Sequence, residues 1–331
     1  MAARTRYAPD RGLTVRMTAT MFLLGLVFVA FVALIIGIMT AAHASGASII
    51  LVAVIFGGGS AFISLFFSDK IALAAAGAQV VTPQQAPELH GIVDRLCALA
   101  DMPKPRVAIA PARMPNAFAT GRNSEHAVLC VTDGLLRYSD LTQEELEGIL
   151  AHELSHVAHK DVQVMTYASL LAIVAGLLVR FAFYSELFGG ARRSDNGQAA
   201  LLIPLIMLAS VVVYAISFLL IRLLSRYREL AADRSGALLT QNPSALISAL
   251  TKVSKGMNRI PTQDLRAAEP LNAFYFAPAM KVNLSGRRGG GGGASLSALF
   301  STHPSLDKRI EQLSKIQREL GQPGAEPRGL R

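Results

Sequence analysis

The sequence predicts a mainly α-helical membrane protein with about four transmembrane helices and a cytoplasmic α+β domain that contains a small sheet. Two observations support this fold class. The 331 residues are 52% hydrophobic and only 17% charged, and their mean hydropathy is +0.40, which is high for a soluble protein. Between the apolar runs lie helical patterns and short segments rich in Val, Ile and Leu, which are typical of a compact domain with a few strands.

Four apolar segments are candidates for transmembrane helices. Met17–Ala42 and Ser48–Ser68 contain no charged residue, and each is long enough to cross about 30 Å of hydrocarbon. Val162–Val179 and Ala199–Ile221 form a second pair, in which Arg180 limits the length of the first member. An alternative for this second pair is a buried hairpin in a soluble domain.

The distribution of basic residues predicts the orientation of the chain. Four arginines precede the first span, whereas the short turn His43–Ala47 contains no Lys or Arg. The positive-inside rule therefore places the N-terminus in the cytoplasm, and two crossings return the chain there before Asp69. Juxtamembrane arginines facing the anionic lipid bilayer account for much of the net charge of +9. The sequence has no interleaved aromatic and basic residues, the pattern that would indicate nucleic-acid binding.

These features divide the chain into six segments. In order, they are a basic cytoplasmic tail (1–16), two transmembrane helices (17–68), the first part of a folded domain (69–161), a transmembrane hairpin (162–221), the second part of that domain (222–320) and a flexible tail (321–331). Cys97 and Cys130 lack the spacing of a metal or redox motif, so we expect free thiols in a reducing compartment.

Local patterns predict the elements of the folded domain. Pro87–Ala100 has a helical pattern, and Arg106–Ala110 and His126–Thr132 are short runs typical of strands. Asn116–Gly121 is a candidate for a third strand. After the hairpin, we expect helices over 222–239, from about Asn242-Pro243-Ser244, and from Ser305 to Leu320, with a flexible loop at Gly289–Gly293.

The helix that closes the first part of the domain carries the most informative motif. Thr142-Gln143-Glu144-Glu145 is a capping box, and apolar residues at helical spacing follow it. On this helix, His152-Glu153-Leu154-Ser155-His156 places two histidines four residues apart, so both imidazoles can reach one zinc ion. Glu153 can then take a proton from a water molecule that the metal activates. The alternative is a pair of histidines on an ordinary helix.

A catalytic zinc site normally has three protein ligands, and Glu229 is the best candidate for the third. His159 lies about 10 Å along the helix from the first histidine, too far to bind the same ion. Glu229 and Asp233 share a helix face, so Glu229 can bind the metal while Asp233 accepts the N–H of a ligating imidazole. In the alternative, both are solvated partners of Arg226 and Arg228. The candidate site therefore holds one Zn²⁺ per chain.

The candidate ligands lie close to the apolar segments in the sequence. His156 is six residues before the third span and Glu229 is eight residues after the fourth. If the helices continue, these separations correspond to about 10–12 Å. A site so near the bilayer is well placed to meet membrane proteins, and both ligands are on the cytoplasmic side in the predicted topology.

Taken together, these motifs resemble those of the HtpX-like integral-membrane zinc metalloproteases, which are related to the CAAX prenyl endopeptidases. The resemblance covers the two N-terminal spans, Asn116–Gly121, the His-Glu-x-x-His helix with Asp161, the hydrophobic hairpin, Glu229 with Asp233, and Thr302-His303-Pro304. The four-span plan is smaller than the helical barrel of the CAAX enzymes, so prenylated peptides are the less expected substrates.

The resemblance implies a zincin-type metallopeptidase domain on the cytoplasmic side of a multi-pass protein of the bacterial inner membrane. It implies roles in stress response and protein quality control, with misfolded or damaged membrane proteins and unfolded polypeptides as substrates. It further implies that Asn116, Ala117 and Phe118 belong to an edge strand that binds substrate backbone. The resemblance also implies that His303 contacts the reacting carbonyl oxygen and is catalytic together with Glu153. The alternative for His303 is a surface histidine that caps the following helix.

Two other functions are compatible with the metal motif. One is a multispanning metal-binding carrier or sensor without protease activity, and the other is a catalytically inactive membrane scaffold. Against the carrier, no span contains the Asp, Glu or His expected of an ion path. Against the scaffold, metal binding alone has no need of a base at Glu153. We therefore expect a zinc metalloendopeptidase, of unknown oligomeric state.

Overall fold

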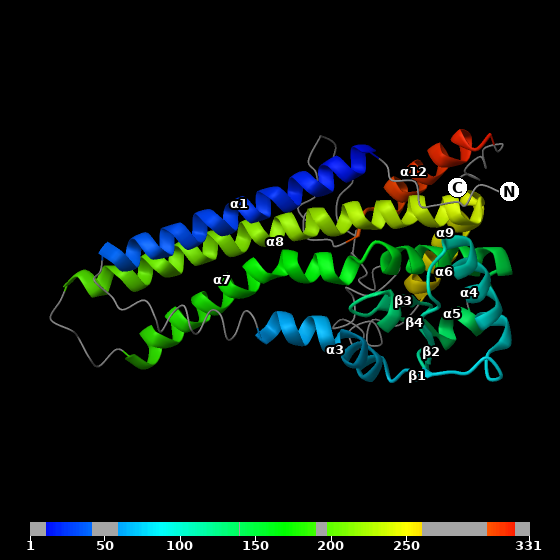
Figure 1. The fold of residues 1–331 in the computed structure, drawn as a ribbon, viewed down its shortest axis with the longest axis horizontal. Helices are drawn as coiled ribbons and strands as arrows, with labels where there is room; N and C mark the ends of the chain where they lie inside the picture. The colour runs from blue at the N-terminus through cyan, green and yellow to red at the C-terminus, as the bar shows by residue number, and fades with distance from the viewer. Residues whose placement is uncertain (1–10, 42–58, 139, 190–196, 260–302, 322–331) are drawn as a thin grey trace. The chain divides into compact units, whose positions relative to one another are not determined.

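The computed structural model describes residues 11–41, 59–138, 140–189, 197–259 and 303–321. Contacts within the chain divide it into two compact units. The first comprises Met1–Leu13, Phe67–Val162 and Arg226–Arg331, and the second comprises Thr14–Phe66 and Gln163–Ser225. The first unit contains the sheet and the histidine motif, whereas the second consists of long apolar helical segments (Figure 1).

The apolar segments form four long helices. These are α1 (Arg11–Ala41), α3 (Gly59–Ala76), α7 (Asp161–Gly189) and α8 (Gly197–Thr240). Two regions within them are long and apolar enough to cross a membrane, Arg11–Leu34 in α1 and Pro204–Thr240 in α8. α7 contains a shorter apolar stretch.

The described residues therefore support two of the four predicted transmembrane helices. The first part of the predicted span Ser48–Ser68 lies outside the described residues, and α3 continues past Ser68 to Ala76. α1 begins at Arg11, so its first turns include Arg11 and Arg16, two of the four arginines that precede the predicted span. The count of four remains a prediction.

The first unit contains most of the remaining elements. They are β1 (Gln79–Val80), α4 (Pro87–Ala100), β2 (Arg106–Ala110), β3 (Ala117–Thr120), a 3₁₀ turn (Ser124–His126), β4 (Val128–Thr132), α5 (Asp133–Tyr138), α6 (Gln143–Ala158), α9 (Pro243–Arg259) and α12 (Leu306–Glu319). The predicted bounds of α4 and β2 are confirmed to the residue. The strand predicted from His126 begins instead at Val128, because Asn123 accepts a hydrogen bond from the His126 amide and caps the 3₁₀ turn.

The helices after the apolar hairpin follow the sequence patterns closely. The helix predicted over 222–239 is the end of α8, and α9 begins at Pro243. α12 begins after Ser305, whose side chain accepts a hydrogen bond from the Lys308 amide. The predicted loop at Gly289–Gly293 lies outside the described residues.

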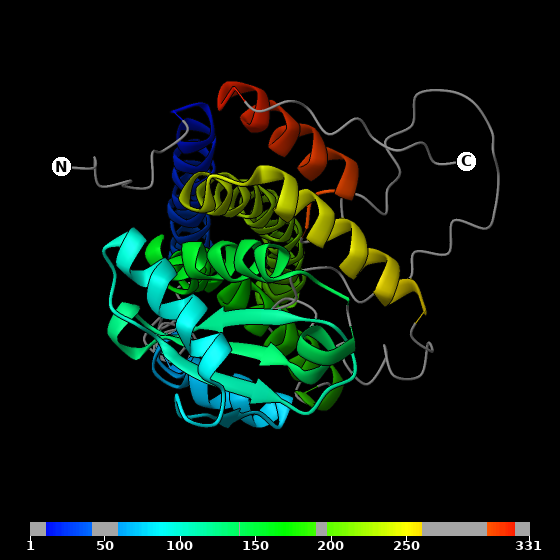
Figure 2. The same cartoon turned by 90° about the vertical axis from the view of Figure 1, so that its right-hand side faces the viewer.

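The four described strands form a mixed sheet in the order β1-β2-β4-β3. β2 and β4 are parallel, and β3 runs antiparallel to β4 at the end of the sheet (Figure 2). The Asn116 carbonyl accepts a hydrogen bond from the Thr132 amide, so the peptide groups of residues 116, 118 and 120 face β4. Because strand residues alternate, those of Ala117 and Ala119 face away from β4, toward the open side.

Each face of the sheet packs against helices. On β4, Leu129 and Val131 belong to the large core shared with α4, α6, α9 and α12. Val128 and Cys130 point to the other face, where they pack with Ala72 of α3. This strict alternation is the period-2 pattern of a strand that is buried on both faces.

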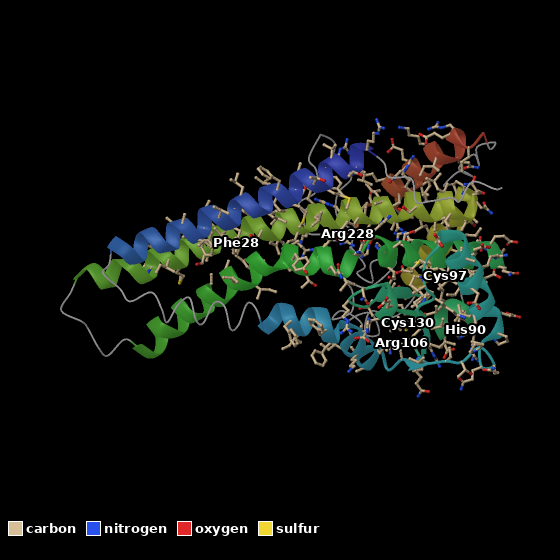
Figure 3. All side chains as sticks on the ribbon, viewed as in Figure 1. Phe28, His90, Cys97, Arg106, Cys130 and Arg228 are labelled. Atoms are coloured by element: carbon tan, nitrogen blue, oxygen red, sulfur yellow. The ribbon has the colours of Figure 1, made fainter. Side chains whose placement is uncertain are left out.

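Both cysteines are confirmed as free thiols. Cys97 lies in α4 and Cys130 in β4, and both are buried (Figure 3). Burial disfavours the thiolate, and it raises the pKa of Cys97 to about 11 and that of Cys130 to about 12. Neither thiol is therefore a reactive nucleophile at neutral pH.

Candidate metal centre

The position of α6 is fixed at its N-terminus by the predicted capping box. Thr142 Oγ1 accepts a hydrogen bond from the Glu145 amide at 3.3 Å, and the Glu145 carboxylate accepts one from the Thr142 amide at 2.7 Å. The same carboxylate accepts hydrogen bonds from Ser248 and Lys252 of α9. The cap thus joins the start of α6 to α9 and sets the direction in which the histidines project.

The structure brings together the three side chains that the sequence identifies as candidate metal ligands. The donor atoms of His152, His156 and Glu229 all lie within 4.8 Å of one another. The two histidine Nε2 atoms are 3.3 Å apart, and Glu229 Oε1 is 3.5 Å from His156 Nε2. Glu229 is only 8% exposed, so its alternative interpretation as a solvated surface group does not hold.

His152 is held by a carboxylate that is itself held by an arginine. Asp233 Oδ1 lies 2.9 Å from His152 Nδ1, as expected if Asp233 orients this imidazole. Arg309 donates to Asp233 Oδ2 from Nε at 2.7 Å and to Asp233 Oδ1 from Nη2 at 2.6 Å. Arg309 is a buried residue of α12, and the sequence analysis did not identify it.

His156 has a matching partner in Asp161, which the sequence analysis included in the family resemblance without assigning it a role. Asp161 Oδ2 lies 2.5 Å from His156 Nδ1. Arg228, in α8 (Figure 3), contacts the Asp161 carboxylate and donates to the Asp161 carbonyl oxygen at 2.6 Å. The only signal in the sequence was the position of Asp161 shortly after the motif and of Arg228 next to Glu229.

Burial sets the protonation states of the motif residues. It lowers the pKa of His156 to about 4, and it lowers the pKa of His152 as well. Both imidazoles are therefore neutral near pH 7, which is the form that binds a metal. Burial, reinforced by the Glu229 carboxylate, raises the pKa of Glu153 well above its ordinary range. Its Oε2 atom accepts a hydrogen bond from the Ala119 amide at 3.1 Å.

The residues expected to bind substrate lie at the end of the described sheet, beside the motif. Asn116, Ala117 and Phe118 are buried, whereas Ala119 is partly exposed, so a peptide would meet this strand at Ala119. A cleft beside the strand is lined on one side by β3 and the turn after it, and on the other by α6 and the start of α7. Its lining includes Ala119, Thr120, Gly121, His156, Val157 and Lys160.

His303 lies against the candidate ligands. It is buried, and its Nδ1 atom is 3.0 Å from Glu229 Oε2. Ser305 caps α12, so the alternative of His303 as a surface helix cap is wrong. Thr302, which precedes it in the motif, lies outside the described residues.

His159 follows the motif but is turned away from the three donors. Its Nε2 atom lies 3.3 Å from Ser235 Oγ, and burial lowers its pKa to about 4. It is not a member of the group of donors around His152, as the helix geometry predicts.

Gly236 allows α8 to approach α6 closely at the metal centre. A Cβ atom at this position would lie 2.9 Å from the His152 backbone nitrogen and 3.1 Å from its Cα. Only glycine fits such an approach without a shift of one helix. Because Glu229 and Asp233 are on the same helix, this contact sets their distance from the histidines.

The buried charges around the three donors fit a divalent cation. In the described part of the chain, four buried carboxylates surround the site, but only two buried guanidinium groups accompany them; the carboxylates are Glu153, Asp161, Glu229 and Asp233, and the guanidinium groups belong to Arg228 and Arg309. Buried charges are stable only when they are compensated. With neutral histidines, a 2+ ion balances the excess when all four carboxylates are ionised, and the N and O donors suit zinc.

Comparison with known proteins identifies related sequences. The model of peptidase family M48 matches residues 83–317. Protease HtpX homolog 1 of Streptomyces coelicolor is 55% identical over 97% of this chain and 98% of its own length. The Protease HtpX homolog of Moorella thermoacetica is 46% identical over 96% of this chain and 98% of its own length. A crystal structure of Ste24p from S. mikatae has a similar fold, with a TM-score of 0.53 and 16% identity over 90% of this chain and 67% of that one.

Proposed function

The chain belongs to peptidase family M48 and is a metalloprotease, and we propose that it is a membrane-embedded zinc endopeptidase with one Zn²⁺ per chain. Its substrates would be misfolded or damaged membrane proteins and unfolded polypeptides, cleaved on the cytoplasmic side of the bacterial inner membrane. The observation that carries this proposal is the convergence of His152, His156 and Glu229 on one point, with Glu153 beside them on α6.

In this proposal His152, His156 and Glu229 hold the zinc ion. When bound, zinc supplies Lewis-acid chemistry, since it makes water a stronger nucleophile and polarises the carbonyl group. Asp233 Oδ1 lies 2.9 Å from His152 Nδ1 and would accept its N–H, which would leave the lone pair of Nε2 directed toward the other donors. Arg309 keeps Asp233 in that position through its two hydrogen bonds.

Glu153 is the proposed general base. Its carboxylate takes a proton from the attacking water and delivers it to the amine that leaves. The Ala119 amide, which donates to Glu153 Oε2, holds the carboxylate between α6 and β3. The base and the strand that would hold the substrate are thereby placed side by side.

His303 is the proposed donor to the carbonyl oxygen, on which negative charge develops during the attack. Its Nδ1 atom contacts Glu229 Oε2. As an imidazolium, with an N–H on both nitrogens, His303 would keep this contact and donate from Nε2 to the substrate oxygen, whose negative charge would balance the added positive charge.

The substrate is proposed to bind as an extended peptide along β3. The carbonyl group of Ala119, a partly exposed residue, faces away from β4, where a main-chain hydrogen bond can add another strand, while the Ala119 amide donates to Glu153. Asn116 and Phe118 would support the strand through their buried side chains without touching the substrate.

The position of the ligands in the chain supports membrane-protein substrates. α7 begins at Asp161, directly after the motif helix, and continues as apolar sequence. Glu229 belongs to the same helix as the candidate membrane span in α8. The cytoplasmic orientation follows from the arginines that precede α1 and within its first turns.

The test is metal analysis combined with casein cleavage by the purified protein. We expect one zinc per chain in the wild type and in Glu153→Gln, with cleavage reduced by about 100- to 10,000-fold in the variant. Glu144→Gln, on an exposed position of the same helix, serves as the control and should cleave normally. Normal cleavage by Glu153→Gln would exclude this mechanism, and a wild type that cleaves equally well without metal would exclude the metal's role.

A further inference from the structure

The contact between His156 and Asp161 suggests a role for a second carboxylate–arginine pair. Asp161 Oδ2 is 2.5 Å from His156 Nδ1, and Arg228 contacts both the carboxylate and the backbone carbonyl of Asp161. We propose that Asp161 and Arg228 are positioning residues, which hold His156 in the orientation and tautomer that binds the metal. This inference rests on the proposed metal site and adds two residues to it.

The first step is the tautomer of His156. A neutral imidazole has one N–H donor and one acceptor nitrogen. With the carboxylate of Asp161 next to Nδ1, the proton resides on Nδ1 and the lone pair on Nε2. Nε2 is the atom that lies 3.3 Å from His152 Nε2 and 3.5 Å from Glu229 Oε1. Asp161 therefore selects the nitrogen that faces the other two donors.

The second step is the difference in burial between the two histidines. The His152 side chain is fully buried, whereas that of His156 is 17% exposed. Neighbouring atoms therefore surround the His152 ring on more sides than they surround the His156 ring. The orientation of His156 therefore depends more strongly on the hydrogen bond to Asp161.

The third step is the role of Arg228. Asp161 is the first residue of α7, and the preceding residue, Lys160, has a positive φ of 55°. A carboxylate at a helix start can also turn toward the free amides of its own helix. Arg228 prevents this by holding the carboxylate and the carbonyl of Asp161 at the same time. Arg228 is adjacent to Glu229. One turn of α8 therefore supplies both the ligand Glu229 and the arginine that holds Asp161 against His156.

An alternative is that the pair only ties the start of α7 to α8. That role predicts a less stable metal-free protein with an unchanged affinity for zinc. The positioning role predicts a weaker affinity, because His156 Nε2 is no longer held toward the metal. The two roles are therefore separated by measuring zinc affinity and the stability of the metal-free protein independently.

The experiment is competition with a zinc chelator, using the full-length protein in detergent. Asp161→Asn should bind zinc about 10- to 100-fold more weakly than the wild type, and the absorption bands of the Co²⁺-substituted protein should change. Glu147→Gln removes another ion pair of α6, with Arg95, and should leave both readouts unchanged. Wild-type zinc affinity in Asp161→Asn, with or without a loss of stability in the metal-free form, would overturn the proposal.

Arg228 is tested in a double-mutant cycle. If it acts through Asp161, Arg228→Gln alone weakens zinc binding, and the addition of Asp161→Asn has little further effect. Fully additive losses would exclude the role of Arg228. The double variant also removes both buried charges together, so it is the one to measure if Asp161→Asn alone does not fold.

These outcomes are distinct from failure of the proposed function. If the wild type binds no zinc, the metal site itself is wrong. If the wild type binds zinc and cleaves casein while the Asp161 variants bind zinc equally well, only the positioning role is wrong. Asp233→Asn provides a reference for the effect of removing a carboxylate from the other histidine.

Discussion

Arg309 donates to both carboxylate oxygens of Asp233, although the two residues are 76 positions apart in the chain. The bond joins α12 to α8 directly behind His152, and both side chains are buried. A planar guanidinium matches a carboxylate with two parallel hydrogen bonds, which a lysine cannot reproduce. The C-terminal helix is therefore part of the support of the metal centre.

Arg309→Met is expected to lower the free energy of unfolding by about 3–5 kcal/mol, because it leaves the Asp233 carboxylate buried without its partner. Zinc affinity should fall in the same variant. Denaturant unfolding and chelator competition measure the two effects. Lys308→Met, at the adjacent exposed position of α12, is the matched control, and an equal effect of both variants would contradict a specific role for Arg309.

Replacement of Glu229 by alanine should sharply reduce the amount of bound zinc, because it removes one of the three proposed ligands. Asp233→Asn should have a smaller effect, a loss of about 10- to 100-fold in affinity or activity, since this residue acts through His152. Metal analysis after dialysis provides the measurement, with Glu311→Ala at an exposed position as control. Full zinc stoichiometry in Glu229→Ala would show that this carboxylate is not a required ligand.

His303→Ala should reduce turnover by about 100- to 1,000-fold while zinc content and fold are retained, as expected for the loss of a transition-state donor. Initial rates of casein cleavage and metal analysis are to be compared with those of His126→Ala, which alters an exposed histidine. If His303→Ala loses only thermal stability and keeps its turnover, the catalytic role is incorrect.

Gly236→Ala should destabilise the protein by about 1–3 kcal/mol, the usual cost of overpacking. The added methyl group would press against the His152 backbone and move Glu229 and Asp233 away from the histidines, so zinc affinity should also decrease. Gly91→Ala is the control, because a Cβ there has no atom within 4 Å. In that helix, alanine should stabilise by about 1 kcal/mol. Equal stabilities of the two variants would argue against the close approach.

The elements that depend on local signals could be predicted from the sequence. The capping box marks the start of α6, Pro243 marks that of α9, and the predicted range of α4 is correct. In each case the residues that decide the structure are within one or two helical turns of each other. The two-residue strand β1 and the short helix α5 were not predicted, because so few residues carry no clear period.

The candidate ligands could also be found from the sequence, and the family resemblance is confirmed by the matches to peptidase family M48. Of the residues that support the ligands, Asp233 was predicted as well, but the two arginines could not be. Arg228 contacts Asp161 from 67 positions away, and Arg309 reaches Asp233 across a still longer stretch. Pairs of this kind are fixed by the packing of α8 and α12, and no local pattern indicates them. Pattern alone also could not show that β3 lies at the end of the described sheet.

The inward orientation of the side chains of β3 has a consequence for selectivity. Ala117 and Phe118 are buried, and Ala119, the partly exposed residue of the strand, has only a methyl side chain, so the strand offers a substrate little besides amide and carbonyl groups. Every polypeptide carries these groups, and a native domain keeps most of them engaged in its own secondary structure. A protease that holds its substrate in this way distinguishes conformation and not residue identity. The damaged state of a protein, in which a stretch of chain is unpaired and extended, would itself be the recognition signal.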